Sequence, residues 1–406
     1  MANEIKNLIL GAGITGLTAA SFLDDYLVLE KQPEVGGYCK TTVKNNFVWD
    51  YSGHFFHFKN EDIKNYLIEN IDCDILEIKK NTKIFYKNSY IDFPFQHNIH
   101  QLSKEEFVEC FNDLAAKKEI DKTNFKSYVK SALGESIANK FIIPYNEKLY
   151  ACDLNELEYD SMGRFFPKII EAKELLNDVK KDSYNDFFIY PKKGTFEFVK
   201  SILKRLDNNK IKTNFEVKKI DLENKLVYTK EEAYRFSNLI NTLPFNKFLG
   251  LCGEDNKDFS FNKVVVFNLG FDSKSFQDHH WIYFPGNEVF YRVGFYDNIL
   301  FQENMSLYVE IGMKSKDNIN EDELLKKVLI DLEEAKIIKG HKLIDHQMVI
   351  MSPAYVHINK RSKEIYQKWC DLNNSRNIYS IGRYGSWTYC SIEDNIIEAM
   401  RVSKKL

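Results

Sequence analysis

A glycine-rich turn between an apolar strand and a helix, close to the start of the chain, constrains the fold more than any other feature. Residues 5–10 (IKNLIL) are an apolar run typical of a buried strand, residues 14–23 (ITGLTAASFL) predict a helix of small and apolar residues, and residues 26–30 (YLVLE) predict a second strand. This order predicts a parallel βαβ unit and therefore an α/β fold class.

The turn carries the spacing G-x-G-x-x-G at Gly11, Gly13 and Gly16. The first glycine permits a tight turn, the second lets a pyrophosphate approach the backbone, and the third lets helix and strand pack closely. The helix N-terminus then offers free N–H groups to phosphates. Glu30 lies nineteen residues after Gly11, where an acid can bind a ribose hydroxyl. The pattern predicts a dinucleotide site, and the alternative is a glycine-rich turn in an unrelated α/β fold.

The residues after Glu30 favour one dinucleotide over another. Residues 31–42 (KQPEVGGYCKTT) contain Gly36 and Gly37 and resemble the extension found in FAD proteins of the amine-oxidase type. Those proteins usually carry Arg or Asn after the glycine pair, whereas Tyr38 and Cys39 stand there in this chain. The glycine turn remains, so FAD is favoured over NAD.

The end of the chain, residues 382–400 (GRYGSWTYCSIEDNIIEAM), has a glycine turn that leads into an amphipathic helix. FAD proteins of this architecture end with such a helix, and its N-terminus faces the pyrimidine side of the isoalloxazine ring. The helix dipole and free N–H groups there stabilise negative charge that develops on reduction. Gly382 and the backbone near Ile392 are the candidate contacts. The alternative is a plain C-terminal docking helix.

Composition excludes several classes of protein. The chain has 406 residues and a formal net charge of -3, which argues against a dedicated nucleic-acid binder. Seven cysteines, an odd number with no C-x-x-C pair, indicate a reduced, cytoplasmic protein. No apolar run reaches membrane-spanning length, and the N-terminus leads directly into a strand, so neither a membrane span nor a signal peptide is expected.

The order of predicted elements indicates a discontinuous FAD-binding domain with two insertions. A helical pattern covers about 102 to 182, short strands follow over 263–312, and the strand at 377–382 feeds the closing loop. The predicted Rossmann-like FAD-binding domain, of the amine-oxidase and mutase type, is assembled from separate segments around a helical insert and an antiparallel sheet for the substrate. The expected boundaries are 1–90, 184–260 and 361–406 for the FAD-binding domain, 91–183 for the insert and 261–360 for the sheet.

A series of motifs, in order along most of the chain, resembles the UDP-galactopyranose mutase family and lies nearer to its eukaryotic-type branch. The segments that carry this resemblance are WDYSGHFFHF (49–58), FPFQHN (93–98), PYNEKLYACDLNELEYDSMGRFFPK (144–168), YNDFFIYPKKG (184–194), WIYFP (281–285), VFYRVGFYDN (289–298), PAYV (353–356) and GRYGSWTY (382–389). The resemblance implies interconversion of the pyranose and furanose forms of a UDP-galactose-like sugar. It also implies attack of reduced flavin N5 on the anomeric carbon, with NADPH or NADH as the reductant.

Two arginines suit a phosphate-binding role. Only eight of the 56 basic residues other than histidine are Arg, and Arg164 and Arg292 stand among aromatic residues. A guanidinium can grip a departing diphosphate through paired hydrogen bonds and keeps its proton. An aromatic, screened pocket strengthens that interaction. The alternative for each is a surface ion pair.

The resemblance implies further substrate contacts. Tyr283, Tyr355 and Tyr389 would cradle the diphosphate, although in a chain with 23 tyrosines each could equally be a core residue. The other implied contacts, for the base, the sugar or the diphosphate, are Phe95, Gln96, Tyr145, Asn146, Tyr150 and Asn185. Tyr150 stands where the family commonly has Trp, and Ser391 replaces an acid seen in bacterial relatives. Both differences leave open which sugar is bound, including an N-acetylated or deoxy galactose.

His54 and His57 lie three residues apart. No third ligand at a suitable spacing accompanies them, so no metal site is expected. His54 is a candidate to lie beside the flavin and sense its reduction, and His57 is the weaker candidate. The alternative for either is a turn histidine bonded to the backbone.

Three functions remain in competition on the sequence alone. The first is a flavin-dependent nucleotide-sugar mutase with a UDP-sugar as its partner. The second is an FAD-dependent oxidase or desaturase of the amine-oxidase class, and the third is a non-catalytic flavoprotein. Two arginines and a nucleotide-framing segment favour the mutase over an oxidase, which needs an apolar or amine-accepting pocket. A homo-oligomer is compatible with all three.

Overall fold

The computed structural model describes residues 2–116, 119–176 and 186–406. Its first sheet contains the predicted βαβ unit, in which β1 (Asn3–Leu10) and β2 (Tyr26–Leu29) pair in parallel on either side of α1 (Ile14–Ala20). The sheet has the order β10-β11-β12-β1-β2-β9, and β18 also pairs with β12. The remaining strands are β9 (Ile211–Lys212), β10 (Lys219–Asp221), β11 (Leu226–Tyr228), β12 (Ala233–Asn241) and β18 (Ile378–Ser380). The Rossmann-like α/β prediction is confirmed.

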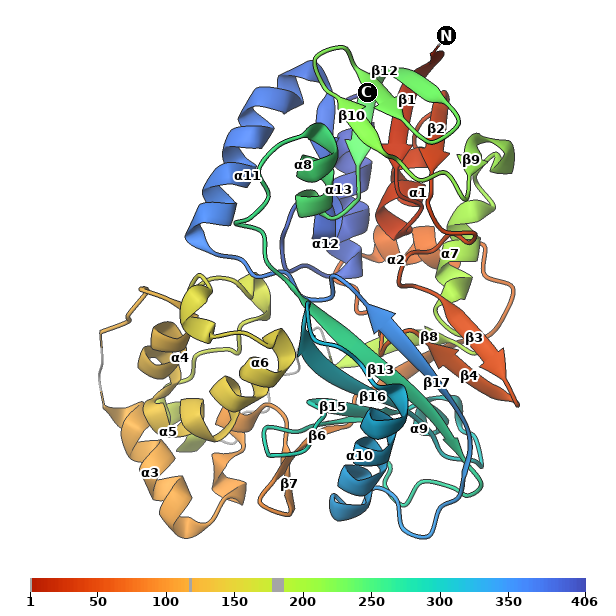
Figure 1. The fold of residues 1–406 in the computed structure, drawn as a ribbon. Helices are drawn as coiled ribbons and strands as arrows, with labels where there is room; N and C mark the ends of the chain where they lie inside the picture. Colours follow the sequence, from red (N-terminus) through yellow and green to blue (C-terminus); the bar gives the residue numbers. More distant parts are fainter. Residues whose placement is uncertain (1, 117–118, 177–185) are drawn as a thin grey trace.

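Helices cover both faces of this sheet because β1 is apolar on both sides. Ile9 packs with residues of α1, α7 (Phe196–Leu203) and α13 (Ile392–Ser403). Leu8 and Leu10 point to the opposite face, which is covered by α8 (Phe245–Cys252) and α11 (Lys360–Asn373). In Figure 1 the red β1 and α1 and the blue α13 lie side by side, although they come from opposite ends of the chain.

The second sheet has seven strands in the order β17-β13-β16-β15-β14-β6-β7, and it lies below the first in Figure 1. Its strands are β6 (Thr82–Tyr86), β7 (Ser89–Asp92), β13 (Asn262–Phe271), β14 (Trp281–Tyr283), β15 (Arg292–Phe295), β16 (Ser306–Lys314) and β17 (Leu343–Met351). The helix α10 (Glu321–Glu334) packs on one face. Strand β6 pairs in parallel with β14, so the sheet also contains residues from the predicted 1–90 segment.

The insert packs against the other face of the second sheet. Its helices are α3 (Lys104–Ala115), α4 (Phe125–Leu133), α5 (Glu135–Ile137) and α6 (Ile143–Tyr150), with a π-helical turn at Ala138–Ile142. Beyond α6 the chain forms only short 3-10 turns up to residue 176, although the sequence pattern predicted helix. Ala151 ends α6 in a left-handed conformation, and Gly163 has φ +50°, so a continuous helix cannot form there.

Two further sheets consist of two antiparallel strands each. The first pairs β3 (Thr41–Lys44) with β4 (Phe47–Asp50), and the second pairs β5 (Ile75–Lys79) with β8 (Phe187–Pro191). The remaining helices that matter for the site are α2 (Glu61–Ile68), α9 (Tyr296–Leu300) and α12 (Gly382–Gly385). Because β4 leads into residues 51–58, this connection brings the predicted His54 loop between the two sheets.

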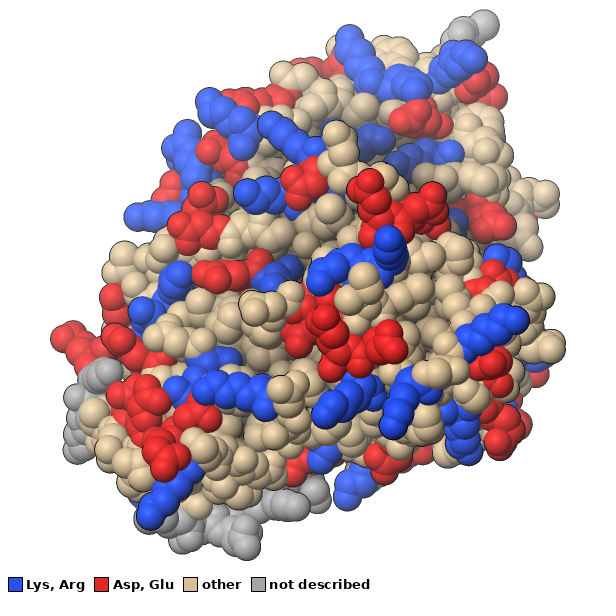
Figure 2. Space-filling model, turned by 60° about the horizontal axis from the view of Figure 1, so that its bottom comes forward, with Lys and Arg blue, Asp and Glu red and all other residues tan. Residues whose placement is uncertain are grey.

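The surface and the remaining structural features add three observations. Figure 2 shows acidic and basic side chains interspersed over one face, without a stripe of a single sign. No helix in the described ranges is both long enough and apolar enough to span a lipid bilayer. All seven cysteines are free thiols.

Candidate active site

The glycine loop has the geometry that its sequence predicted. Gly11 adopts φ +98°, a conformation that favours glycine, and its N–H donates to the Leu29 carbonyl at 2.8 Å. A Cβ on Gly16 would overlap the Gly11 carbonyl oxygen. The first and third glycines are therefore required by the chain's own packing.

Gly13 serves a different purpose from the other two glycines. The nearest atom to a Cβ at this position would be the Gly37 Cα at 3.9 Å, so a methyl group would meet no protein atom closely. Gly37 itself has φ +59°, and Gly36 pairs with Gly13 in an isolated bridge. Two glycine backbones thus face each other beside the loop. Glu30 accepts hydrogen bonds from the N–H groups of Ala12 at 2.8 Å and Gln32 at 2.9 Å, which holds its carboxylate at the rim of the loop.

The closing segment docks directly on this loop. Gly382 has φ +81°, and a Cβ there would lie 2.7 Å from the Thr15 hydroxyl oxygen of α1. The Arg383 N–H donates to Asn395 Oδ1 at 2.6 Å, and the Thr15 hydroxyl donates to the same oxygen at 3.2 Å. Ser391 and Asp394 form a reciprocal capping box at the start of α13. The first amides of α13, including that of Ile392, therefore end close to the glycine loop.

His54 lies between the two large sheets. Gly53 precedes it, and a Cβ on Gly53 would overlap the Tyr308 ring, so this tight approach needs a glycine. The His54 Nδ1 is buried without a hydrogen-bond partner among the described residues. Burial lowers the pKa of His54 to about 4; the Glu310 carboxylate opposes that change, and the positive charges of Arg292 and Arg383 reinforce it. His54 is therefore neutral at pH 7.

Arg292 and Glu310 form a buried ion pair across β15 and β16, in directly paired register. The guanidinium donates from Nε to Glu310 Oε2 at 2.6 Å and from Nη2 to Oε1 at 2.7 Å. Ser52 also donates to Glu310. Burial alone would raise the pKa of Glu310, but the charge and hydrogen bonds of Arg292, together with hydrogen bonds from Ser52 and Tyr291, hold the pKa below its usual value. The side chain of Arg292 remains 18% exposed and that of Glu310 is fully buried, so only the cation can reach a ligand.

Four of the predicted tyrosines gather beside Arg292. Tyr145 meets Tyr283 edge-on with ring centroids 5.3 Å apart, and Tyr355 stacks on Tyr389 at 5.9 Å. The charge of Arg292 acts on the hydroxyls of Tyr145, Tyr283 and Tyr355. All four rings are only half-buried. We call Tyr145, Tyr283, Tyr355 and Tyr389 the tyrosine cluster.

Three predicted contacts carry buried polar atoms without a partner among the described residues. Gln96 donates from Nε2 to the Lys168 carbonyl at 3.1 Å, and Asn146 donates from Nδ2 to the Ile142 carbonyl at 2.7 Å. The oxygens Gln96 Oε1 and Asn146 Oδ1 and the Tyr150 hydroxyl have no partner. Since buried polar atoms are normally paired, these three are suited to meet a ligand.

The two remaining predicted contacts are Phe95 and Asn185. Phe95 is fully buried, stacked on Phe141 at 5.4 Å and edge-on to Tyr86 at 5.8 Å. Aromatic residues enclose its ring, and its contact with a base stays a prediction. Asn185 lies outside the described residues.

Arg164 is not placed opposite Arg292 as a second open cation. Its Nη2 donates to both carboxylate oxygens of Asp394, at 2.9 and 2.8 Å, and to the Ser391 hydroxyl at 3.0 Å. The guanidinium also lies 4.7 Å from the ring centroid of Phe165, which in turn contacts Tyr389. Arg164 therefore borders the tyrosine cluster from outside, and its charge is balanced by the capping carboxylate of α13.

His57 fits the backbone-bonded alternative. Its Nδ1 lies 2.8 Å from the Phe187 carbonyl oxygen, and burial lowers the pKa of His57 to about 4. Among the described residues, no group of three or more His, Cys, Asp or Glu side chains is arranged to hold a metal ion.

Sequence reasoning missed three residues of this site: Tyr308, Glu310 and Arg383. Glu310 is a lone acid at an inward position of the apolar segment SLYVEIGM, and that pattern already signals a buried carboxylate in need of a partner. Arg383 is one of only eight arginines and stands in the aromatic segment GRYGSWTY. Tyr308 carried no signal that separates it from the many core tyrosines.

Comparison with known proteins supports the architecture. Residues 9–69 match the family described as NAD(P)-binding Rossmann-like domain. A solved structure of reduced UDP-galactopyranose mutase superimposes with a TM-score of 0.91 at 20% identity, covering 98% of this chain and 93% of that one. The chain has the amine-oxidase and mutase fold.

Two other solved structures are similar at lower scores. A putative protoporphyrinogen oxidase from Exiguobacterium sp. 255-15 has a TM-score of 0.79 and 15% identity, with 100% of this chain and 98% of that chain covered. Cyclohexylamine oxidase from Brevibacterium oxydans IH-35A has a TM-score of 0.71 and 11% identity, with coverages of 99% and 98%. The predicted fold class, a Rossmann-like domain combined with a second sheet and a helical insert, is confirmed.

Proposed function

We propose that the chain binds FAD between its glycine loop and the start of α13. The open side of Gly13, opposite the Gly37 backbone, gives a pyrophosphate room to approach two glycines that have no side chains. The capped N-terminus of α13 offers amides and a partial positive charge to the flavin end. These features fit a dinucleotide that spans both ends of the chain. Bound and reduced, FAD would supply a nucleophilic nitrogen to a sugar's anomeric carbon.

The proposed reaction is the interconversion of pyranose and furanose forms of a UDP-galactose-like nucleotide sugar. The observation that carries it is that the charge of Arg292 acts on the hydroxyls of Tyr145, Tyr283 and Tyr355. Gln96 and Asn146 add buried oxygens that have no partner among the described residues. A uracil edge needs both donors and acceptors, which amide side chains provide. A diphosphate needs a cation and neutral hydroxyl donors, which Arg292 and the tyrosines provide.

The residues around the sugar would keep the reaction free of competing proton chemistry. His54 is neutral at pH 7 and Glu310 is ionised but locked to Arg292 and Ser52, so neither is an open general acid. The tyrosines exclude water from the anomeric centre while a diphosphate is detached. Arg292 holds that diphosphate for its return.

The amine-oxidase alternative is supported by the shared fold, with TM-scores near 0.7 for cyclohexylamine oxidase and putrescine oxidase. An amine substrate is a cation before it reacts, and Arg383, which has no carboxylate partner among the described residues, would repel it from the same site. The charge of this site therefore favours an anionic substrate.

The test is an assay of net interconversion. Purified protein loaded with FAD and reduced by dithionite under anaerobic conditions should convert UDP-galactofuranose to UDP-galactopyranose, followed by ion-exchange chromatography. The oxidised protein should not do so, and a reduced nicotinamide cofactor should replace dithionite. Flavin reduction by a panel of amines with hydrogen peroxide release, and no sugar conversion, would show that the proposal is wrong.

Arg292→Ala tests the phosphate-binding role of Arg292 in the same assay. Loss of the guanidinium should lower turnover by about 10²-fold or more, because one charged phosphate contact is removed from the transition state. FAD content, read from flavin absorbance, should stay near that of the unaltered protein. Near-normal turnover in this variant would contradict the phosphate role of Arg292.

A further inference from the structure

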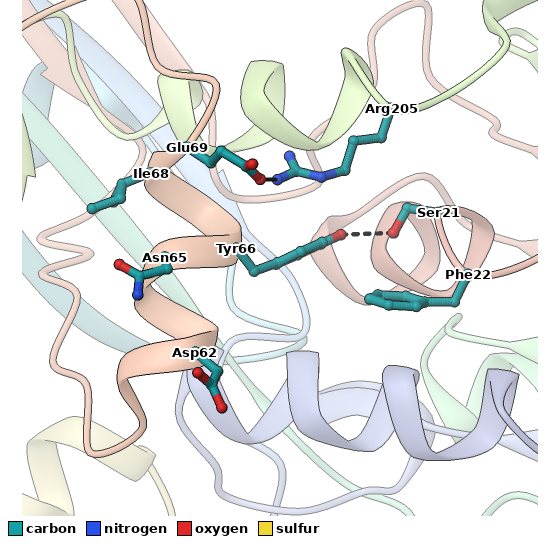
Figure 3. A pocket seen from close by; sticks show the side chains of 8 residues that line it. All are labelled: Ser21, Phe22, Asp62, Asn65, Tyr66, Ile68, Glu69 and Arg205. Carbon is teal, nitrogen blue, oxygen red and sulfur yellow. Dashed lines mark hydrogen bonds and ion pairs between the residues drawn. The ribbon is translucent and has the colours of Figure 1, made fainter.

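Four arginines of the described residues stack on aromatic rings, and three of them have a carboxylate partner. Arg164 lies over Phe165 and pairs with Asp394. The other two balanced examples are Arg292 over Tyr308 with Glu310 and Arg205 over Tyr66 with Glu69. Figure 3 shows the last example, where the Arg205 guanidinium meets Glu69 at the edge of a surface pocket of about 540 Å³.

Arg383 is the exception. Its guanidinium carbon lies 4.6 Å from the ring centroid of Tyr389 and 5.2 Å from that of Tyr355. Its Nη1 donates a hydrogen bond to the Cys390 carbonyl oxygen at 3.1 Å. No carboxylate lies within ion-pair distance of it in the described part of the chain. A half-buried guanidinium with spare donors calls for an anion.

A second, independent observation points to the same place. Tyr150 is 1% exposed, and within the described part of the chain its hydroxyl has no hydrogen-bond partner. Its ring meets Tyr355 edge-on at 5.6 Å. The charge of Arg383 and the hydroxyls of Tyr355 and Tyr389 all act on the Tyr150 hydroxyl. Tyr150, with its buried hydroxyl, and Arg383, with its unbalanced charge, therefore both contact the Tyr355 ring.

The charge balance of the site leads to the same conclusion. Arg292 and Glu310 cancel each other, as do Arg164 and Asp394, and His54 is neutral. Arg383 therefore provides the net positive charge beside the tyrosine cluster. A diphosphate with roughly two to three negative charges is held best where the protein's own charges are not already neutralised.

We propose that Arg383, together with the Tyr150 hydroxyl, forms the second half of a nucleoside-diphosphate site, opposite Arg292. The inference rests on the proposed function for the identity of the ligand. It assigns to Arg383 the diphosphate contact that was predicted for Arg164. The Arg383 side chain lies against Tyr355 and Tyr389, and its charge reaches His54. These contacts place the guanidinium on the substrate side and not on the glycine loop.

The experiment measures binding of two probes, UDP and inorganic pyrophosphate, to the FAD-loaded protein by calorimetry. Arg383→Met should raise the Kd for both probes by about 10- to 100-fold, the usual effect of losing a charge-assisted contact. Tyr150→Phe, which keeps the ring, should raise the Kd by about 3- to 10-fold. Arg164→Gln should have a smaller effect than Arg383→Met. The matched control is Arg361→Gln, since Arg361 is 68% exposed and pairs only with Asp258 among the described residues.

Other outcomes would overturn the inference. If Arg383→Met and Tyr150→Phe bind both probes as the unaltered protein does, the site does not hold a diphosphate. If Arg383→Met loses FAD while the loaded fraction keeps its affinity for UDP, the guanidinium serves the cofactor. If Arg383→Met fails to fold, Tyr150→Phe decides. Weakened pyrophosphate binding in a protein that converts no nucleotide sugar would support this subsite and contradict the proposed reaction.

Discussion

His54 is a single residue whose charge the fold controls through burial. Its pKa of about 4 in the fold lies below the 6.5 of an exposed histidine, so between these values the unfolded chain binds a proton that the folded chain does not. Folding is therefore more favourable above pH 6.5, and this contribution falls as the pH drops toward 4. From pH 7 to pH 5 the expected loss in the free energy of unfolding from this residue is about 2 kcal/mol.

Urea unfolding at pH 7 and pH 5, for the unaltered protein and for His54→Gln, measures this loss. The variant removes the titrating group, so its free energy of unfolding should change less between the two pH values, by about 2 kcal/mol. Other buried histidines titrate equally in both proteins and cancel in the comparison. An identical pH dependence in the two proteins would mean that the fold leaves the pKa of His54 at its ordinary value.

Residue-level prediction from the sequence succeeded where the chemistry is local. Gly11, Gly13, Gly16 and Glu30 follow one another within a single βαβ unit, so their spacing already fixes their geometry. It could not reveal the ion pair of Arg164 with Asp394, because these residues lie 230 positions apart in the chain. Pairings of that kind depend on how distant elements pack.

Among the elements, α13 joins the insert to the first sheet through its first turn. Ser391 caps the helix, Asp394 completes the capping box, and Arg164 binds Asp394 from the insert. Asp394→Ala removes the Asp394 half of the capping box and the ion pair, while the Ser391 hydroxyl still accepts from the backbone N–H of residue 394. It should lower the free energy of unfolding by about 1–2 kcal/mol, measured by urea denaturation.

Arg164→Gln separates the two contributions because it keeps the capping box. The Arg164 and Asp394 side chains are 31% and 34% exposed, and such pairs contribute at most about 1 kcal/mol. The variant should therefore lose less stability than Asp394→Ala. Equal losses in the two variants would show that the ion pair, and not the cap, holds the start of α13.

Element-level prediction was reliable for periodic segments and weak for irregular ones. The βαβ unit, four of the seven strands of the second sheet (β13, β14, β15 and β16) and the closing helix were predicted from hydrophobic pattern, whereas β6, β7 and β17 were not. The extended stretch from Ala151 to residue 176 was predicted as helix because it has few turn residues, yet a left-handed cap and tertiary contacts keep it irregular. The pairing of Arg292 with Glu310 required the β15–β16 register, which no local pattern encodes.

At the scale of the whole molecule, the two ends of the chain meet at the proposed cofactor site. Thr15 in α1 shares Asn395 Oδ1 with the backbone of Arg383, and Ser403 in α13 donates to the Ala19 carbonyl at 3.0 Å. A ligand bound to both ends stabilises the folded state by mass action, about 2.7 kcal/mol at a free concentration of 100 times its Kd. Added FAD should therefore raise the melting temperature of the apoprotein.

A pair of glycine variants tests whether this stabilisation acts through the loop. Gly13→Ala places its methyl group in open space beside Gly37, so the apoprotein should keep its stability within about 0.5 kcal/mol, while FAD should bind at least about tenfold more weakly. Gly16→Ala, inside α1, would ordinarily stabilise a helix by about 1 kcal/mol. Here its Cβ meets the Gly11 carbonyl oxygen, so a loss of about 1–3 kcal/mol is expected without any ligand.

The two variants thus separate cofactor binding from folding, since one methyl group lies where the ligand would lie and the other lies inside the protein's own packing. Thermal unfolding of both variants and of the unaltered apoprotein, with and without added FAD, gives the six values needed. Gly13→Ala should melt as the unaltered apoprotein does and gain little from FAD. If it instead gains as much as the unaltered protein, the pyrophosphate does not pass over Gly13 and the glycine loop is only a structural turn.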